Sequence, residues 1–292
     1  MKLKIVVSLI FILLSSLLLF AQNSDETKEE KDSTTKKDKK SYFTASTTFN
    51  TNSTFAGRAE QTFNPTADVM IGYNFKSGLY LNGEVGVAPT QPVLFGGIDL
   101  TGGYEFSIIK DLLSVDLNYT HYFAQNQSKV SSEIQGSASG IISVDLDWIN
   151  LQLTPSYNYG SSIGDALFSV GASKEIHLFA VGKDSITITP SIKAYAGTQK
   201  LLEQHVNNPT KKAKTKAAIA ALAATAALNA QYNQLYSKFN YLDTDIELPI
   251  SFTLKSFTFE LTPTLSLPTN LVQKTQFIAN PFYIDFTVSI KI

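Results

Sequence analysis

The chain contains no cysteine and only three histidines among its 292 residues. The lack of cysteine excludes disulfide frameworks, thiolate zinc sites and cysteine nucleophiles. With 24 basic and 25 acidic residues, the formal charge of −1 gives no excess of positive charge with which to hold a nucleic acid. Apolar residues make up 43% of the chain, too many for a disordered protein and too few for a bundle of membrane helices.

Aromatic residues are what the sequence has in quantity. It contains 19 Phe, 13 Tyr and one Trp, accompanied by many Thr, Ser and Val residues. These side chains fit a pleated, half-buried strand better than a helix. The composition therefore indicates an all-β protein.

The first 21 residues have the pattern of a secretory signal peptide. Lys2 and Lys4 precede an apolar run over residues 5–20, and Ala21 follows it. The run is shorter than the roughly 20 residues of a membrane-spanning helix, which disfavours the alternative of an uncleaved anchor. We therefore expect export and removal of residues 1–21.

Residues 22–40 are almost entirely Asp, Glu, Lys, Ser and Thr. A segment without apolar side chains cannot form a core, so we expect a disordered charged leader. The alternative interpretation is that the lysines between Lys36 and Lys40 contact an anionic partner.

From residue 41 onward, apolar and polar residues alternate over stretches of about ten residues, separated by turn-forming segments. Strands of this length with one apolar and one polar face are typical of a transmembrane β-barrel, in which lipid meets one face and water the other. The alternation predicts twelve strands, over residues 41–50, 68–76, 79–87, 98–106, 113–120, 141–149, 150–160, 165–176, 185–196, 245–254, 257–267 and 282–292.

The linkers favour a barrel over a soluble β-sandwich, which would show the same alternation. Tight links over residues 76–78, 109–111, 149–150 and 255–256 alternate with long ones over 53–64, 88–95, 124–140, 197–241 and 268–280; the link after Gly160 is a short exception. Short turns at one rim and long loops at the other are typical of barrels. Outward aromatics near strand ends resemble two interfacial girdles, with Phe75, Phe106, Trp148 and Phe257 at the short-turn rim and Phe123, Tyr157, Tyr159 and Phe282 at the long-loop rim.

The expected fold class is thus an antiparallel up-and-down transmembrane barrel of about twelve strands covering residues 41–292. An even number of strands places both termini on one side, which for an exported bacterial chain is the periplasm. The alternating strands resemble those of Gram-negative outer-membrane β-barrel proteins. A stretch with Phe55, Gly57, Arg58, Gln61, Thr62 and Pro65, followed by Gly72-Tyr73 and Ser77-Gly78-Leu79-Tyr80, loosely resembles the opening of a family of uncharacterised porins.

The final strand resembles the C-terminal signal read by the barrel-insertion machinery, although it ends in Ile292 where an aromatic residue is usual. This resemblance implies contact with that machinery during biogenesis, and contact with outer-membrane lipid and lipopolysaccharide afterwards. Three Thr-Pro pairs, at 154–155, 189–190 and 262–263, each predict a bulge or an unpaired position, because proline cannot donate to a strand ladder.

If the apolar side chains face lipid, the side chains that alternate with them along each strand face the lumen. These include many acids and few bases. Such a wall attracts cations in a water-filled channel; the alternative is a solvated, hydrogen-bonded polar lining. The predicted lumen acids are Asp68, Glu84, Asp99, Glu105, Asp116, Asp145, Asp147, Asp245, Glu247, Glu260 and Asp285, and the predicted lumen bases are Lys76, Lys193, Lys255 and Lys291.

The long loop 197–241 contains an Ala-rich tract over residues 211–239 with apolar residues at helical spacing. We expect a helix there. Three interpretations stay open: a constriction folded into the barrel mouth, a surface that holds a protein partner, or a solvated helix. Its first lysines, Lys211 to Lys216, suit lipopolysaccharide phosphates or luminal acids.

Catalytic and cofactor chemistry have little support in the sequence. His121 has lipid-facing parity, His177 lies in a predicted turn and His205 in the long loop, and no nucleophile is fixed beside any of them. No phosphate-binding loop, metalloprotease helix or calcium loop occurs, so we expect no catalytic residue, metal site or cofactor.

The sequence therefore favours a narrow passive channel for small solutes, with a cation preference. Twelve strands lie between the filled eight-stranded barrels and the open channels of about sixteen strands. The alternative is a closed barrel that serves as a scaffold in an outer-membrane assembly or secretion complex, through its helical loop and leader. A lipid-active enzyme is the third and weakest interpretation.

Overall fold

The computed structural model describes residues 40–52, 54–55, 58–59, 65–88, 95–123, 134–160, 163–181, 184–201, 237–269 and 281–292. The predicted signal peptide (1–21), nearly all of the predicted leader (22–40) and most of the predicted helix (211–239) lie outside the described residues. Of that leader only Lys40 is described, and of that helix only residues 237–239, in a turn. Within the described residues, no helix is long and apolar enough to cross a bilayer.

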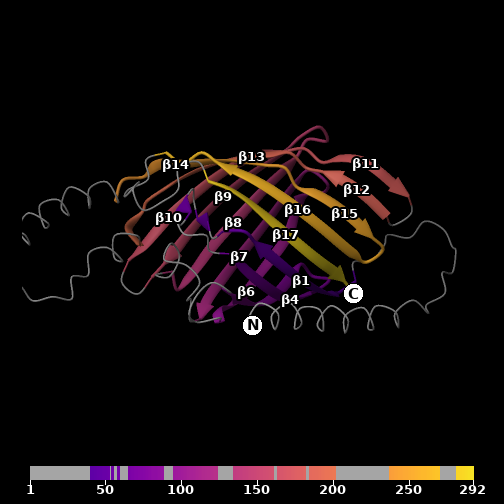
Figure 1. Ribbon diagram of the computed structural model, residues 1–292, viewed down its shortest axis with the longest axis horizontal. Coiled ribbons are helices and arrows are strands. Elements are labelled where there is room, and N and C mark those ends of the chain that lie inside the picture. Colours follow the sequence, from indigo (N-terminus) through magenta and orange to yellow (C-terminus); the bar gives the residue numbers. More distant parts are fainter. Residues whose placement is uncertain are drawn as a thin grey trace, which may run out of the picture.

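The described strands form a single closed antiparallel barrel, shown from the side in Figure 1. Its strands are β1 (Tyr42–Asn50), β4 (Thr66–Asn74), β5 (Leu79–Val87), β6 (Phe95–Ile109), β7 (Leu113–Phe123), β8 (Gly136–Asp145), β9 (Asn150–Tyr159), β10 (Gly164–Ser173), β11 (Ile176–Val181), β12 (Asp184–Ile188), β13 (Ser191–Gly197), β14 (Asn240–Glu247), β15 (Ile250–Leu254), β16 (Phe257–Ser266) and β17 (Phe282–Lys291).

Closure comes from the pairing of the first strand with the last. β1 pairs with β17 in register from Thr44 opposite Lys291 to Asn50 opposite Asp285. The backbones of Phe43 and Ile292 exchange two hydrogen bonds of 2.9 Å beyond that ladder. Because a lipid-exposed sheet edge would leave backbone groups unsatisfied, this seam is a requirement for a membrane-spanning sheet.

Three of the barrel positions are occupied by split strands, so the barrel has twelve positions, as the sequence predicts. β10 continues into β11, β12 into β13, and β14 into β15. Two of these breaks contain proline, at Pro190 between β12 and β13 and at Pro249 between β14 and β15. A missing backbone N–H interrupts the ladder there.

Of the predicted bulges or unpaired positions at the three Thr-Pro pairs, no bulge occurs at Pro155 or Pro263, although Pro263 lies where the ladder of β16 with β14 and β15 is interrupted. Pro155 lies within β9 opposite Phe168, and Pro263 lies within β16 opposite Ile284, both in unbroken register. The register shifts instead at other places, among them Tyr195/Ala196 opposite the extra residue Leu242. Proline is tolerated in a strand wherever its nitrogen is not called on to donate.

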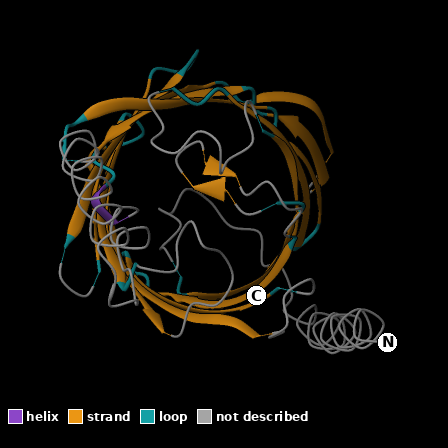
Figure 2. Ribbon diagram, turned by 60° about the vertical axis from the view of Figure 1, so that its left-hand side comes forward, coloured by secondary structure: helices purple, strands orange, loops and turns teal. Residues whose placement is uncertain are grey.

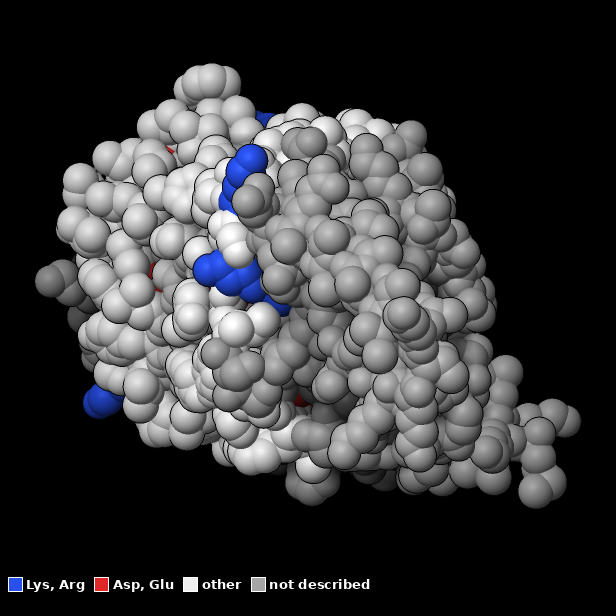
Figure 3. Space-filling model, turned by 90° about the vertical axis from the view of Figure 1, so that its left-hand side faces the viewer, with Lys and Arg blue, Asp and Glu red and all other residues white. Residues whose placement is uncertain are grey.

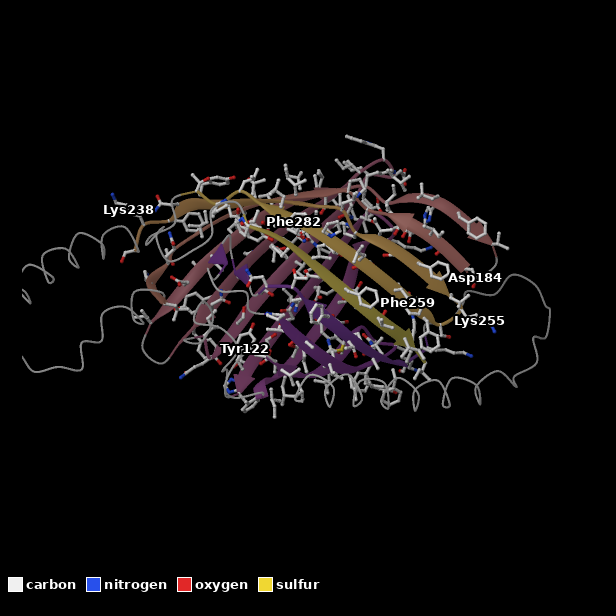
Figure 4. All side chains as sticks on the ribbon, viewed as in Figure 1. Tyr122, Asp184, Lys238, Lys255, Phe259 and Phe282 are labelled. Carbon is white, nitrogen blue, oxygen red and sulfur yellow. The ribbon has the colours of Figure 1, made fainter. Side chains whose placement is uncertain are left out.

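Tight turns join the strands at one rim, which we call the short-turn rim. The start of β1 and the end of β17 lie at the same rim (Figure 1). Several of these turns use a left-handed backbone, at Gly78 (φ 98°), Asp111 (φ 59°), Asp147 (φ 63°) and Lys255 (φ 56°). At the same rim the β11–β12 hairpin continues past the neighbouring turn between β8 and β9. In Figure 4, Asp184 and Lys255 mark this rim, where the Lys255 backbone N–H donates to the Asp184 carboxylate (3.0 Å).

Large apolar side chains cover the outside of the barrel. Ile71, Leu81, Leu100, Leu117 and Val170 are each at least half exposed, at 58%, 55%, 50%, 53% and 50%. In water, this much exposed apolar surface would be costly at roughly 25 cal/mol per Å². A continuous apolar band around a closed barrel is instead the surface that lipid covers.

A short hairpin lies inside the outline of the barrel. β2 (Thr54–Phe55) pairs with β3 (Arg58–Ala59) in a separate two-stranded sheet within the first long loop. Figure 2 looks nearly along the barrel and shows the hairpin within the ring of strands, and Figure 1 places it near the long-loop ends of the strands. The backbone of this hairpin therefore narrows the barrel, a role that the sequence suggested for the loop 197–241.

Candidate functional site

The inward face of the barrel is mainly polar, with a few apolar residues such as Ile141 opposite Asp116. Hydroxyl and amide side chains pair across neighbouring strands, as between Thr48 and Thr287 (3.0 Å) and between the hydroxyls of Thr101 and Thr120 (2.8 Å). The Ser139 hydroxyl donates to the Asn118 side chain at 2.6 Å. These contacts stiffen a wall whose polar groups would otherwise need water.

Seven acids form a band on adjacent strands, which we call the acidic belt. They share the inward parity and lie in the half of the lumen nearer the long loops. Going around the barrel through the β1–β17 seam, the acidic belt consists of Asp99, Glu84, Asp68, Asp285, Glu247, Asp245 and Asp243.

The first half of the acidic belt brings like charges together. Glu84 is directly opposite Asp99 in the β5–β6 pair, and it interacts electrostatically with Asp68. Asn50 donates its amide to the Asp68 carboxylate (3.0 Å), and its cross-strand partner is Asp285. Asn50 therefore connects the two halves of the belt across the seam.

The second half of the acidic belt contains an ion pair. The Lys193 ammonium contacts the Glu247 carboxylate at 3.1 Å, and the Ser191 hydroxyl donates to the same oxygen at 2.9 Å. Asp245 and the fully buried Asp243 lie next to them on β14. The Ser266 hydroxyl of β16 donates to Asp243 at 2.6 Å.

The wall facing the acidic belt is mainly neutral. On β7 to β9, the inward positions in register at this level hold hydroxyl and amide side chains, including Thr120, Ser137, Ser156 and Asn158. On β10, the buried Asp165 lies opposite Asn158 and is the one acid of this wall among the described residues at this level. The lumen is thus asymmetric, with seven carboxylates on one side and mostly neutral hydrogen-bonding groups on the other. A cation in this passage is attracted to one wall without meeting a repulsive charge on the other.

The remaining predicted acids of the wall lie closer to the short-turn rim. The Tyr80 hydroxyl donates a hydrogen bond that the two Asp116 carboxylate oxygens share, each at 3.0 Å, and Glu260 accepts one from Ser251 at 2.6 Å. Glu105 lies opposite Asp116. Asp145 is exposed at the end of β8 and accepts from the backbone N–H of Asp147 (3.1 Å).

Lysines gather at the same end of the lumen. A cavity of about 680 Å³ there is lined by Lys40, Lys76 and Lys291 together with Glu105 and aromatic rings. The Lys291 ammonium lies 3.8 Å from the centre of the Tyr42 ring, a cation–π contact. Within the described residues, the short-turn end of the lumen therefore carries mixed charge, including three lysines. The long-loop end is mainly acidic.

Three predicted lumen residues belong to turns instead of the wall. Lys76, Asp147 and Lys255 lie in the β4–β5, β8–β9 and β15–β16 turns, and all three are exposed. At each of these strand ends, the alternation of apolar and polar residues in the sequence continues past the end of the strand into the turn. Conversely, the sequence prediction missed Asp243 and Asp165, both inward and buried. The spacing of Asp243, Asp245 and Glu247 at every second residue could have revealed the first.

The face of the molecule at the long-loop end shows basic side chains, whereas acids are nearly hidden from this side (Figure 3). Lys238 is exposed beyond the strand ends, at the far left of Figure 4. Near this rim on the outside, the His121 ring lies 3.2 Å from the Tyr159 hydroxyl and packs edge-on against Phe123. These neighbours form part of an aromatic girdle.

A closed antiparallel barrel with an apolar outside, aromatic rims and a polar lumen defines a transmembrane β-barrel, the class that spans bacterial outer membranes. No family model and no curated protein sequence matches the chain. Among solved structures, it is similar to the KdgM porin at 10% identity and a TM-score of 0.47, covering 85% of this chain and 97% of that one.

Two further solved structures show similarity at the same level. The NanC porin has 8% identity and a TM-score of 0.45, with 86% and 100% of the two chains covered. LpxR from Salmonella typhimurium has 9% identity and a TM-score of 0.41, with 85% and 99% covered. At such scores the similarities transfer no activity or ligand to this chain.

Proposed function

We propose that the protein is a narrow outer-membrane channel for small solutes with a preference for cations. The observation that carries this proposal is the acidic belt facing a mainly neutral wall inside a closed barrel. Carboxylates that line a water-filled passage with low-dielectric walls raise the local concentration of cations and lower that of anions. Seven belt acids far outnumber the one lysine that contacts them directly, Lys193 at Glu247, among the described side-chain ion pairs.

The size of the passage supports small solutes. Twelve strands enclose less space than the sixteen or more of open aqueous channels. The β2–β3 hairpin lies within the barrel outline and takes up part of that space (Figure 2). Hydrated ions and molecules of a few heavy atoms suit such a passage better than oligomeric solutes do.

We place the short-turn rim and both termini in the periplasm and the long loops at the cell surface. Short periplasmic turns with longer external loops support this orientation. The acidic belt then lies near the external mouth, and lysines such as Lys76 and Lys291 lie near the periplasmic mouth. Outer-membrane lipid and lipopolysaccharide would contact the apolar band and its aromatic rims.

Single-channel recording tests the proposal. The full mature chain is refolded in detergent, shown to be a folded barrel by its heat-modifiable migration, and added to a planar bilayer. We expect stepwise current increases of uniform size. Folded, inserted barrels that conduct no ions would refute the channel.

A second candidate function is supported by one observation, the free edge of β11. Among the described strands, β11 pairs only with β12, and its six residues are all exposed. Leu178 and Val181 are 60% and 62% exposed. An open edge cannot lie in hydrocarbon, and in water it is a template for another strand. A scaffold barrel would use it to bind an extended segment of a partner protein.

Site-specific photo-cross-linking in cells distinguishes this candidate. A cross-linking residue at Leu178 should give a discrete protein adduct if β11 binds a partner strand. The matched control is Leu117, which is similarly exposed on the lipid-facing wall and should give none. The absence of an adduct at Leu178 would remove the scaffold function from consideration at this edge.

A further inference from the structure

We propose that Asp243 and Asp245 form a binding site for a divalent cation of the calcium type, which fastens β14 to β16 near the long-loop rim. Both residues belong to the acidic belt. The site does not depend on conduction, however, because a barrel that passes no current could still hold this ion.

The two carboxylates are buried and incompletely satisfied. Asp243 is 0% exposed and Asp245 is 7% exposed. Among the described residues, the Oδ1 atom of each is buried without a hydrogen-bond donor. Burial of an anionic oxygen without a donor or a counter-charge is strongly unfavourable, so such a group calls for a specific partner.

Asp165 shows what a satisfied buried carboxylate looks like in the same barrel. It is 4% exposed, and it accepts hydrogen bonds from the Thr198 hydroxyl (2.7 Å) and from the backbone N–H groups of Lys200 (2.6 Å) and Leu201 (3.0 Å). The Asp165 carboxylate thereby caps backbone N–H groups at the start of a helical turn. Asp243, by contrast, accepts a hydrogen bond from the Ser266 hydroxyl at one oxygen, and its Oδ1 atom has no donor among the described residues. A carboxylate in this barrel can therefore be buried and still accept hydrogen bonds from several donors.

The local backbone brings the two acids together. Leu242 is an extra residue opposite the Tyr195/Ala196 step, and it is fully buried. From Asp243 onward β14 resumes its alternation, so that Asp243 and Asp245 share the inward face and lie within hydrogen-bonding reach of each other. Two carboxylates at such a separation cannot both be charged without a cation or a proton between them.

The nearest basic partner does not supply that charge. Lys193 is the cross-strand partner of Asp245, yet its ammonium contacts both Glu247 oxygens, at 3.2 and 3.1 Å. Asp243 lies opposite Tyr195, which carries no charge to offer. A cation from solution would take the place of the proton that two carboxyl groups in hydrogen-bonding contact otherwise share.

The donor set selects the kind of ion. The available groups are carboxylate and hydroxyl oxygens, which hard cations prefer. No group of three or more His, Asp or Glu side chains within the described part of the chain could hold a metal, so water and backbone carbonyls would complete the shell. Calcium accepts irregular shells of six to eight oxygens, whereas magnesium requires near-octahedral geometry. A site with few protein charges is expected to bind in the range of about 10⁻⁴ to 10⁻³ M.

Terbium luminescence and calcium-dependent stability test the site on the whole mature barrel. The protein is refolded in detergent without lipopolysaccharide, treated with EDTA, and titrated with Tb³⁺ under excitation of tyrosine. Tyr195 lies opposite Asp243 and should sensitise the ion, whereas Trp148, the single tryptophan, lies in a turn at the other rim. Calcium should displace the Tb³⁺ signal and raise the temperature of heat-modifiable unfolding.

Three variants separate the outcomes. Asp243→Asn and Asp245→Asn should each weaken Tb³⁺ binding by at least about tenfold and abolish the calcium effect on unfolding. Tyr195→Phe should lose most of the luminescence but retain the calcium effect. Asp116→Asn is the matched control, because it removes a luminal charge whose oxygens already accept from Tyr80; whatever its unfolding temperature, it should bind Tb³⁺ as the unmodified chain does and retain the same calcium-induced rise in that temperature.

Each other result overturns the site. If EDTA and calcium leave the unfolding temperature of the unmodified chain unchanged and no Tb³⁺ signal appears, the pair holds a shared proton instead. If Asp245→Asn retains full binding, the ion lies elsewhere. Should Asp243→Asn fail to fold, Asp245→Asn and Tyr195→Phe still decide between these results. None of them depends on conductance, so failure of the site and failure of the channel are separate outcomes.

Discussion

Glu84 and Asp99 lie directly opposite each other on the inward faces of β5 and β6. Like charges in a cross-strand pair are destabilising, and opposite or neutral pairs gain roughly 0.2–1 kcal/mol by comparison. A pair of this kind is retained at a cost in stability, which fits a functional wall better than a structural one. The acidic belt continues from this pair to Asp68 on β4.

Neutralising one member of this pair should therefore stabilise the barrel. We expect Glu84→Gln to raise the free energy of unfolding by up to about 1 kcal/mol. Urea unfolding in detergent measures it. Glu260→Gln is the control, since Glu260 accepts hydrogen bonds from Ser251 and Thr262 and should gain nothing. Destabilisation by Glu84→Gln would show that its carboxylate is favourably bound.

The hydrogen bonds from Tyr80 to Asp116 should stabilise the barrel measurably. Tyr80→Phe removes a donor to a charged group, which typically costs about 1.5–3 kcal/mol. The urea midpoint, followed by the fluorescence of Trp148, should fall. Tyr104→Phe is the control, because that ring is on the outer face and 44% exposed, and its midpoint should stay nearly unchanged. Equal midpoints for Tyr80→Phe and the original chain would contradict the structural role of this pair.

Gly78 in the β4–β5 turn should not accept any side chain. Its φ of 98° is unfavourable for L residues, and an added Cβ would lie 2.1 Å from the Glu105 carbonyl oxygen. We expect Gly78→Ala to reduce the folded yield severalfold in refolding assays. Gly83→Ala on β5 is the control, because its Cβ would meet only the Leu100 side chain at 3.5 Å. Equal yields for the two variants would argue against this turn geometry.

The lipid-facing and lumen-facing sides of β5 can be tested with adjacent residues. Leu81 is 55% exposed on the outer face, and its neighbour Asn82 has inward parity. A lysine on the lipid face near the bilayer centre costs roughly 2–4 kcal/mol. We expect Leu81→Lys to unfold at much lower urea than Asn82→Lys. The reverse order would mean that the barrel faces are assigned the wrong way round.

The fold could be predicted from the sequence because the strands alternate regularly. Asp68, Glu84 and Asp99 were placed in the lumen by parity alone, since each lies inside an unbroken strand. β8 was predicted too late in the chain, at 141–149 instead of Gly136–Asp145, because Gly136 to Gly140 are all small and show no apolar alternation.

The missed features depend on contacts between distant segments. The extra residue Leu242 places two apolar residues in succession before Asp243, so the start of β14 was hidden and Asp243 was overlooked. The β2–β3 hairpin has too few residues for a periodic pattern, and its position inside the barrel is set by the surrounding strands. Lys76, Asp147 and Lys255 follow the alternation, yet turn geometry removes them from the wall.

The ion selectivity of the acidic belt is the most direct measurement of the central claim. The reversal potential is recorded in a salt gradient for the original barrel, for Asp68→Asn/Glu84→Gln/Asp99→Asn, and for Asp111→Asn/Asp147→Asn/Glu175→Gln. The last variant removes the same charge from exposed positions at the short-turn rim. We predict cation selectivity that falls sharply in the belt variant and persists in the rim variant. Equal reversal potentials for the three barrels, or anion selectivity of the original one, would contradict the account.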